Sequence, residues 1–326
     1  MTAIHVAARP ALRRQPDPLA GASIGIVPIN WNNADLPDLT PFVPSDVVLD
    51  EIARLGFEGT QTGVGYPAGE ALRAELARRG LRLAEVYAAL PCTVDGPAPD
   101  ALEIGRAKLR ELVAADGEVL IAALGLSPER EPHAGRASDP ATPRLTDEGW
   151  RRLALLVDTL ARDARDAGRR LAYHQHAGTF VERPEELDRL VAELDALAGT
   201  APSPAGICLD VGHYTVGGGD PVAALRQFGA RVTHVHLKDV DPVPLAALRD
   251  GSIGGFLDAL RARIYTELGS GVVDVAGILS VLAAREYAGW IMVEQDTTWN
   301  PPSESAGMSR RVLDYAIRHV GTRGRR

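Results

Sequence analysis

Cysteine is nearly absent from this sequence. The 326 residues contain only Cys92 and Cys208, so a single disulfide is the most that the chain can form by itself. Disulfide-dependent folds are rich in cysteine and belong to oxidising compartments. The lack of a cysteine pattern therefore excludes a disulfide framework and predicts a protein of the cytoplasm.

Lysine is scarce as well. Only Lys108 and Lys238 are lysines, and the other basic residues are arginines. Acidic residues number 43 against 35 basic ones, and the formal net charge is −8. Proteins that bind nucleic acid depend on basic surfaces that neutralise phosphates. We therefore expect no nucleic-acid partner, whereas an acidic cleft would suit a bound cation.

Long apolar runs are also missing from the N-terminus. Residues 1–20 contain no continuous hydrophobic segment and are interrupted by prolines at positions 10, 16 and 18. A signal peptide or a membrane span needs such a segment. We predict a mobile extension over residues 1–20, a C-terminal tail over residues 321–326, and no association with a membrane.

Between these ends, over residues 21–320, apolar runs alternate with patterns typical of helices. We predict strands within 22–31, 59–64, 81–90, 118–125, 171–178, 205–214, 231–240 and 287–297. We predict helices over 47–56, 68–79, 98–115, 146–168, 183–198, 220–228, 273–285 and 303–319. Continuous apolar strands that alternate with helices are typical of a parallel sheet. Eight such units favour an α/β fold with one (β/α)₈ (TIM) barrel over a doubly wound sheet, whose glycine-rich first turn is absent here.

Two inserts interrupt this alternation. Residues 126–145 follow the fourth predicted strand, and residues 241–272 follow the seventh. Loops after strands lie at the carboxyl-terminal face of a barrel, where TIM barrels carry their active sites. We expect the inserts to cover the site or to support self-association into a homo-oligomer.

The last four predicted strands end in ionisable side chains. In chain order these are His174 and His176, then Asp210 and His213, then His234, His236 and Lys238, and finally Glu294. Aspartate and glutamate are almost never fully buried without compensation, which a divalent metal ion supplies. One side chain from each strand gives a mixed nitrogen and oxygen ligand set of His174, Asp210, His236 and Glu294. This set suits Mn²⁺, Co²⁺, Fe²⁺ or Zn²⁺ rather than Ca²⁺, and a purely structural role is the competing interpretation.

The other polar residues at these strand ends have more than one interpretation. His213 is expected to contact substrate, with a loop histidine of no role as the alternative. Lys238 would orient substrate, act as a base whose pKa a metal lowers, or form a surface pair with Asp239 or Asp241. His234 is interpreted as a buried histidine or as a group behind the metal ligands.

The loop after the first predicted strand contributes Trp31 and Asn32. Asparagine often only makes turns. At the mouth of a barrel, however, an indole ring for stacking and an amide for hydrogen bonds suit a hydroxylated ring. We therefore name both residues as candidate substrate contacts.

Several segments together resemble one enzyme family. They are PINWNNADLPDL (28–39), GFEGTQTGVGYP (56–67), LAYHQHAGT (171–179), LDVGHYTVGGGDP (209–221), HVHLKDV (234–240) and GWIMVEQD (289–296). Over about residues 22–320 the chain is similar to the inosose dehydratase branch of the xylose isomerase-like superfamily of TIM-barrel sugar isomerases and epimerases. The resemblance implies metal ligation by Asp210, His236 and Glu294 and a substrate contact at His213. For the metal we expect Mn²⁺ or Co²⁺ first, with Zn²⁺, Fe²⁺ and Mg²⁺ as alternatives.

The resemblance also implies a reaction and a small-molecule substrate. The reaction is the loss of water from 2-keto-myo-inositol (inosose), by removal of the proton next to the ketone and departure of the β-hydroxyl. His176, Lys238 and Glu294 are the candidates for proton transfer. His174 stands where sugar epimerases of the superfamily carry glutamate, which favours dehydration, and Gln61 stands where the dehydratase branch often has glutamate, which affects substrate contacts.

Two other functions stay open at this point. One is a metal-dependent epimerase or isomerase of ketoses or keto-polyols, which would return the proton to carbon. The other is a barrel that binds polyols and has lost catalysis.

Overall fold

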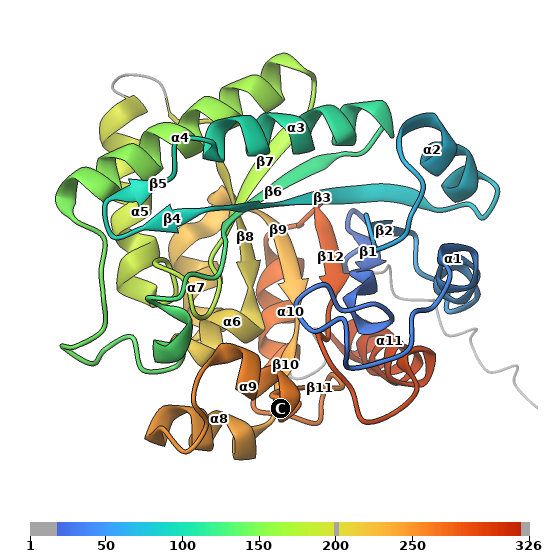
Figure 1. Ribbon diagram of the computed structural model, residues 1–326. Coiled ribbons are helices and arrows are strands. Elements are labelled where there is room, and N and C mark those ends of the chain that lie inside the picture. Colours follow the sequence, from blue (N-terminus) through green and yellow to red (C-terminus); the bar gives the residue numbers. More distant parts are fainter. Residues whose placement is uncertain (1–17, 199–201, 321–326) are drawn as a thin grey trace, which may run out of the picture.

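Eight parallel strands close into a barrel in the computed structural model, which describes residues 18–198 and 202–320 (Figure 1). In chain order they are β1 (Ser23–Ile26), β2 (Gly59–Gln61), β3 (Arg82–Leu90), β6 (Val119–Leu124), β7 (Arg170–His174), β8 (Gly206–Asp210), β9 (Val232–Leu237) and β12 (Trp290–Val293). The barrel closes where β12 pairs with β1. Every strand overlaps a predicted run, so the predicted α/β class and (β/α)₈ barrel are confirmed.

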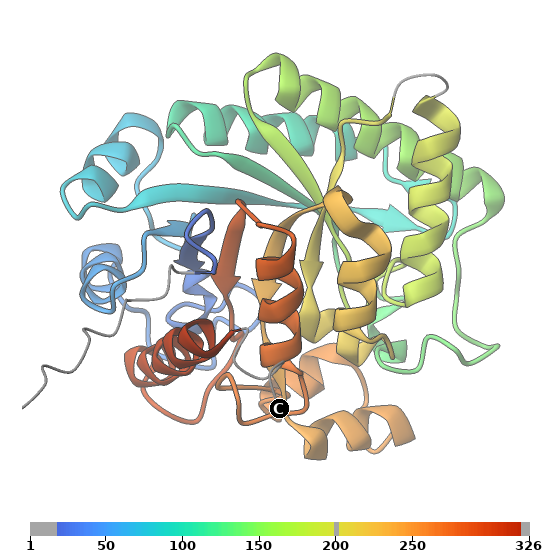
Figure 2. The same cartoon turned by 180° about the vertical axis from the view of Figure 1, so that it is seen from behind.

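Helices surround the barrel on its outside, as Figures 1 and 2 show from opposite sides. They are α1 (Ser45–Arg54), α2 (Gly69–Ala77), α3 (Ala101–Ala114), α4 (Asp147–Asp166), α5 (Pro184–Ala198), α7 (Pro221–Phe228), α10 (Val275–Ala284) and α11 (Pro302–His319). Because helices cover the outer face and side chains fill the interior, β6, β8 and β12 are buried along their whole length. The start of α4 is capped by Thr146, whose hydroxyl accepts the Gly149 N–H at 3.0 Å.

The structure adds elements that the sequence patterns do not predict. β3 continues into a hairpin of β4 (Cys92–Thr93) and β5 (Gly96–Pro97). A short helix, α6 (Val211–Val216), begins directly after β8. Five of its six residues are buried, so the amphipathic period that usually marks a helix is missing.

The second insert contains two helices. These are α8 (Pro242–Asp250) and α9 (Phe256–Arg261), and a two-residue pairing of β10 (Asp239–Val240) with β11 (Tyr265–Thr266) closes its base. The first insert contains a single 3₁₀ turn, η2 (Glu131–His133). Figure 1 shows α8 and α9 together at the lower edge of the molecule.

The two inserts are joined to each other. The Glu131 carboxylate accepts the Leu257 N–H at the start of α9, at 2.8 Å. The Arg136 guanidinium donates to the carbonyl oxygens of Leu248 and Ile253, at 2.9 and 3.2 Å. Segments about 120 residues apart in the chain therefore form one layer over the carboxyl ends of the strands.

Buried ionic groups connect this layer to the start of α5 and to the loop after β7. Arg130 is completely buried and donates to both carboxylate oxygens of Glu186, at 2.9 and 3.1 Å. Beside this pair, the buried Glu182 carboxylate accepts the N–H groups of Gly135 and Gly178, at 2.9 and 2.6 Å. Burial raises the pKa of Glu182 to about 7.

The ends of the chain differ in part from the prediction. Of the predicted N-terminal extension, residues 1–17 lie outside the described residues, as does the predicted tail over 321–326. Residues 18–20 form a turn, and Leu19 packs in the core with 4% of its surface exposed. The folded barrel domain therefore begins a few residues before position 21. No helix in the described part of the chain is long and apolar enough to cross a membrane.

Glycine makes room for large side chains inside the barrel. A Cβ atom placed on Gly59 of β2 would lie 2.6 Å from the Trp290 ring and 2.7 Å from the carbonyl oxygen of Arg82. Neither neighbour is the free end of a flexible side chain. Trp290 itself is almost completely buried at 1% exposure, so its ring has no space into which to move.

We predict that Gly59→Ala destabilises the protein by about 1–3 kcal/mol, because the added methyl group overpacks the barrel interior. Gly21→Ala is the matched control, since its added Cβ would meet nothing closer than 3.4 Å. Urea denaturation of both variants beside the wild type measures the difference. Equal stabilities of the two variants would contradict the prediction.

We predict that Glu182→Gln changes how stability depends on pH. The pKa of Glu182 is raised in the folded protein, so its contribution to stability is present at low pH and is lost as the pH rises toward about 7. Between pH 5 and pH 8 the free energy of unfolding of the variant should gain about 1–3 kcal/mol relative to the wild type. A difference between the two proteins that stays constant over this range, measured by urea denaturation, would argue against the prediction.

Candidate metal centre and adjoining cavity

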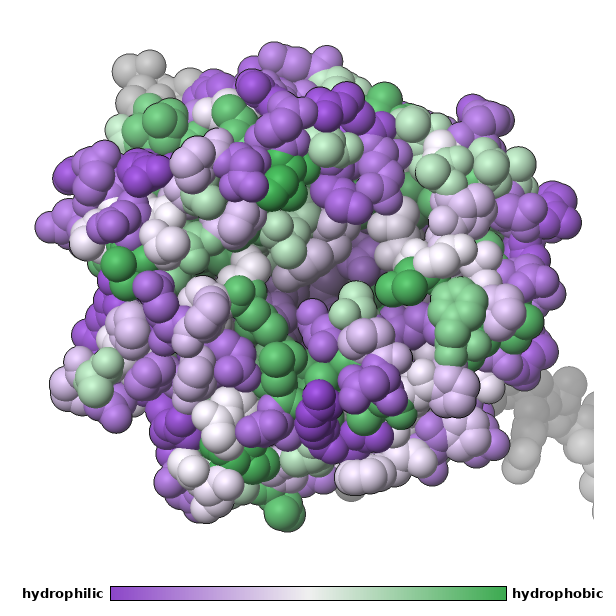
Figure 3. All heavy atoms as spheres, viewed as in Figure 1, coloured by the Kyte–Doolittle hydropathy of each residue, from purple (hydrophilic) through white to green (hydrophobic). Residues whose placement is uncertain are grey.

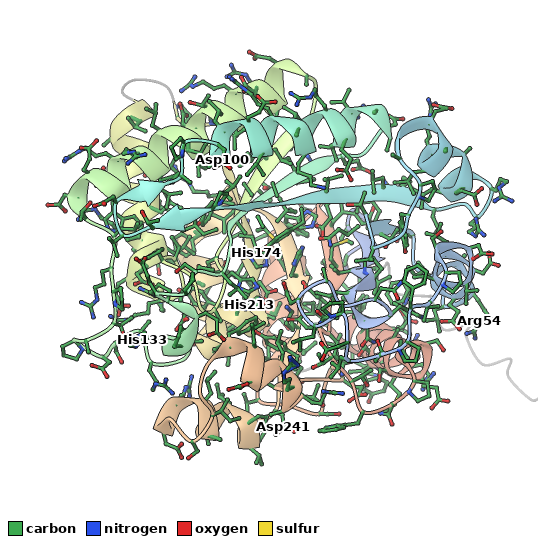
Figure 4. The ribbon with its side chains drawn as sticks, viewed as in Figure 1. Arg54, Asp100, His133, His174, His213 and Asp241 are labelled. Atoms are coloured by element: carbon green, nitrogen blue, oxygen red, sulfur yellow. The ribbon has the colours of Figure 1, made fainter. Side chains whose placement is uncertain are left out.

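The four predicted metal ligands converge at the carboxyl ends of neighbouring strands. His174 ends β7, Asp210 ends β8, His236 lies in β9 and Glu294 directly follows β12. All four are buried, and one ligand atom from each lies within 4.8 Å of the others. The Nε2 atom of His174 is 3.4 Å from Asp210 Oδ2, and His236 Nδ1 is 2.6 Å from Glu294 Oε2. Figure 4 shows His174 in the middle of the barrel.

The atoms that face this point are in contact with one another and with the Lys238 ammonium, but they lack well-formed hydrogen bonds. Asp210 Oδ2, His236 Nδ1 and Glu294 Oε2 are buried and have no hydrogen-bond partner among the described residues. Buried polar atoms are normally satisfied, so three such atoms in one place require an explanation. Two imidazoles and two carboxylates fit a divalent ion that accepts mixed nitrogen and oxygen ligands, and the two carboxylates balance its charge. The cluster is therefore consistent with a divalent metal site.

Asp210, His236 and Glu294 each have two polar side-chain atoms. One of the two contacts another part of the protein, so the other points toward the centre of the cluster. Asp210 Oδ1 accepts an N–H group at the start of α6, at 2.8 Å. The Nε2 atom of His236 lies 3.0 Å from Glu85 Oε2 and can only donate to it. Glu294 Oε1 lies 3.2 Å from the Lys238 ammonium. The local structure thus leaves one free atom on each of these three ligands.

Lys238 lies in the interior, among carboxylates. It is completely buried, and its Nζ atom is 2.8 Å from Asp296 Oδ1, 3.2 Å from Glu294 Oε1 and 3.4 Å from Asp210 Oδ2. Burial disfavours the ammonium, yet these carboxylates hold the pKa of Lys238 well above its usual value. The same ammonium, with His236, lowers the pKa of Glu294 to about 2 against the opposing effect of burial.

One expectation for Lys238 is therefore corrected. It is not a surface lysine paired with Asp239 or Asp241. The Asp239 carboxylate accepts backbone N–H groups of residues 269–273, and Asp241 caps α8. The role of Lys238 as a base whose pKa a metal lowers stays a prediction.

His176 and His213 form a stacked pair beside the ligand cluster. Their ring centroids are 3.7 Å apart, and Phe256 of the second insert packs against both rings. His213 is buried, and its Nδ1 atom lies 2.8 Å from the Tyr265 hydroxyl and 3.2 Å from the Ala177 N–H. His176 is only half-buried, so it lies between His213 and the space above the metal ligands. Figure 4 shows His213 next to His174.

A cavity of about 230 Å³ adjoins the cluster. Its polar lining consists of Asp35, Gln61, Tyr87, His174, His176, Glu294 and Asp296. On the face that carries the strand-end loops, Figure 3 shows a hollow near the middle with hydrophilic side chains inside. His174 and Glu294 belong both to this lining and to the ligand cluster, so a molecule in the cavity would reach the metal position.

The structure places only some of the predicted substrate contacts at the cavity. Gln61 and His176 line the cavity, whereas His213 lies behind His176. Trp31 is buried with its indole N–H bonded to Glu51, at 2.5 Å. Both polar atoms of the Asn32 amide are bonded to the backbone of Val43, at 2.8 Å. The structure therefore gives Trp31 and Asn32 roles in shaping the first loop, and we no longer assign them to substrate.

Sequence reasoning missed four residues at the site. Glu85 is completely buried inside the barrel, and Asp35, Tyr87 and Asp296 line the cavity. The sequence could have indicated Glu85, since a lone carboxylate within an apolar strand needs a compensating cation or donor. Asp296 shares the face of Glu294 by the two-residue period of an extended chain. Tyr87 carried no signal, because tyrosine is common in strands.

Comparison with known proteins agrees with this architecture. A family model for the xylose isomerase-like TIM barrel matches residues 49–315. An inosose dehydratase of Geobacillus kaustophilus is 32% identical over 302 residues, which cover 91% of this chain and 95% of that protein. The rhizopine catabolism protein MocC of Rhizobium meliloti is 34% identical over 312 residues, covering 94% of this chain and 91% of that protein.

Solved structures share the fold at lower sequence identity. An L-ribulose 3-epimerase superposes with a TM-score of 0.66 at 17% identity, covering 93% of this chain and 97% of the other. This likeness concerns the fold alone. Because the family model extends over most of the barrel, the chain belongs to the xylose isomerase-like TIM barrel family.

Proposed function

We propose that this protein is a metal-dependent hydro-lyase that removes water from a keto-inositol such as 2-keto-myo-inositol. The observation that carries the proposal is a cluster of two histidines and two carboxylates beside a small cavity that has both polar and apolar lining residues. The similarity over nine-tenths of the chain to an inosose dehydratase supports the same substrate. A cavity of about 230 Å³ suits a single six-membered ring with several hydroxyl groups.

The metal ligands we propose are His174, Asp210, His236 and Glu294. A divalent ion bound there would act as a Lewis acid that polarises the ketone and would orient a neighbouring hydroxyl. We propose Mn²⁺ or Co²⁺ as the ion, with Zn²⁺, Fe²⁺ and Mg²⁺ as alternatives. The residues present fit such an ion because their free atoms converge and are otherwise unsatisfied.

His176 is the base that we assign to the proton next to the ketone. Its Nδ1 atom lies 2.7 Å from the carbonyl oxygen of Ala177, which can only accept, so Nδ1 carries the hydrogen. The Nε2 atom then has a lone pair. Burial and the neighbouring His174 lower the pKa of His176 to about 3, so the imidazole is neutral.

The departing hydroxyl needs a proton of its own. Asp296 lines the cavity and is bonded to Lys238 at 2.8 Å, so this pair is our candidate for the acid. Lys238 acts from behind the cavity by holding Asp296 and Glu294 in place. Glu294 is the alternative base, because it is the other carboxylate that reaches both the cavity and the cluster.

Incubation of the purified, metal-loaded protein with inosose tests this function. We expect an enedione product, followed by its ultraviolet absorbance, and loss of activity after chelation that returns when Mn²⁺ or Co²⁺ is added. Asp210→Asn should lower both the metal content and the turnover at least about 100-fold, because it removes a charged ligand. An isomeric product without water loss would indicate an epimerase, and tight binding without turnover would indicate a polyol-binding barrel; either result contradicts the proposal.

His176→Ala should separate catalysis from metal binding. We expect unchanged metal content and a kcat lowered about 10²–10⁴-fold, the usual contribution of a positioned general base. His133→Ala is the matched control, because this histidine lies in the first insert, outside the cavity lining (Figure 4). Full turnover of His176→Ala with metal bound would remove His176 from the mechanism.

A further inference from the structure

A second polar group lies inside the barrel, beneath the metal ligands. It consists of Glu85 and the two histidines of β9, His234 and His236, all of which are at most 1% exposed. The Oε2 atom of Glu85 is 3.0 Å from His236 Nε2 and 2.5 Å from His234 Nε2. A buried carboxylate is stable only with donors or cations close by, and here the His236 imidazole is hydrogen-bonded to it while the His234 imidazole lies within ion-pair distance.

The contact spans the barrel. Around the closed sheet the order is β1, β12, β9, β8, β7, β6, β3, β2, so β3 and β9 stand four places apart on opposite walls. Glu85 therefore reaches His236 through the interior and not along the sheet. No pattern within either strand indicates such a pair, because the two residues are 151 positions apart in the chain.

The contact between Glu85 and His236 affects which nitrogen of His236 can bind a metal ion. The ring of a neutral histidine has one N–H and one lone pair, and the partner of one nitrogen decides which nitrogen binds a metal. Since Glu85 can only accept, it keeps a hydrogen of His236 on Nε2, so a metal ion that replaces the contact between Nδ1 and Glu294 would bind the Nδ1 lone pair. The Nδ1 atom is the one that faces Glu294 Oε2, at 2.6 Å, within the ligand cluster.

We propose that Glu85 is the positioning residue of the metal centre, which sets the tautomer and the ring orientation of His236 from the opposite wall of the barrel. The inference rests on the metal site of the proposed function and adds a residue that determines its affinity. Glu85 touches neither the cavity nor the metal position, so it acts only through His236.

A competing interpretation is a second metal site deeper in the barrel. Cys208, His234 and His236 also bring ligand atoms within 4.8 Å of one another. Such a site would need a nitrogen of His236, yet Nε2 is bonded to Glu85 and Nδ1 faces the upper cluster. One ion per chain, held by the upper cluster, is therefore the arrangement that the contacts support.

Metal affinity tests the proposal without reference to turnover. Glu85→Gln keeps the shape of the side chain but allows its amide to donate toward His236, so the Nε2–H tautomer is no longer enforced. We expect the affinity for Co²⁺, measured by titration of the metal-free protein, to fall about 10–100-fold with the stoichiometry still at one. The visible spectrum of the Co²⁺ protein should change as the imidazole reorients.

Glu182→Gln is the matched control. It also removes a buried carboxylate, but that carboxylate lies among the inserts and accepts only backbone N–H groups. Its affinity for Co²⁺ should equal that of the wild type. If Glu85→Gln lowers the melting temperature but leaves Co²⁺ affinity and spectrum unchanged, Glu85 has only a structural role and the proposal is wrong.

Nitrogen NMR of the Zn²⁺-loaded wild type supplies a measurement that does not depend on any variant folding. With histidine labelled by ¹⁵N, we expect His236 to keep its hydrogen on Nε2 and to bind zinc through Nδ1. Zinc bound through Nε2, or two ions per chain, would overturn the proposal. A wild type that binds no divalent ion would instead refute the metal site of the proposed function, so the two failures are distinguishable.

Discussion

The burial of several carboxylates at one end of the barrel is the constraint on which the rest of this structure depends. Glu85, Asp210, Glu294 and Asp296 are all buried, and Lys238 is the one buried ammonium beside them. Carboxylates in such surroundings are stable only with cations or hydrogen-bond donors close by. Such cations and donors are provided by the histidines of β7 and β9, by the lysine after β9 and by the proposed divalent ion. The same groups that stabilise the barrel interior therefore form the chemistry of the site.

The carboxyl ends of the strands and the barrel interior below them have different roles. At the carboxyl ends, four neighbouring strands supply the ligand cluster, and the two inserts cover it through Phe256 and the contacts between Glu131 and α9. In the interior, glycine on β2 leaves space for Trp290, which closes the barrel below. A rigid interior beneath a site limits how far each ligand can move, which favours one metal geometry.

Sequence patterns predicted more of the site than of its surroundings. His174, Asp210, His236 and Glu294 meet as predicted because residues at the ends of adjacent parallel strands share one edge. Lys238, by contrast, was open to a surface interpretation, and only its burial among three carboxylates excludes that. Trp31 and Asn32 were assigned to substrate from residue type alone, and their partners Glu51 and Val43 were not visible in the pattern.

The sequence by itself determined the alternation of eight strands and helices, the closed parallel barrel and the convergence of His174, Asp210, His236 and Glu294, because these follow from local periodicity and chain order. The tertiary structure alone decided which polar residues face the cavity and which face one another. Glu85 shows the reason: its partner His236 stands on the opposite wall, 151 residues away. Such a contact depends on how the barrel closes, and no local pattern records the result.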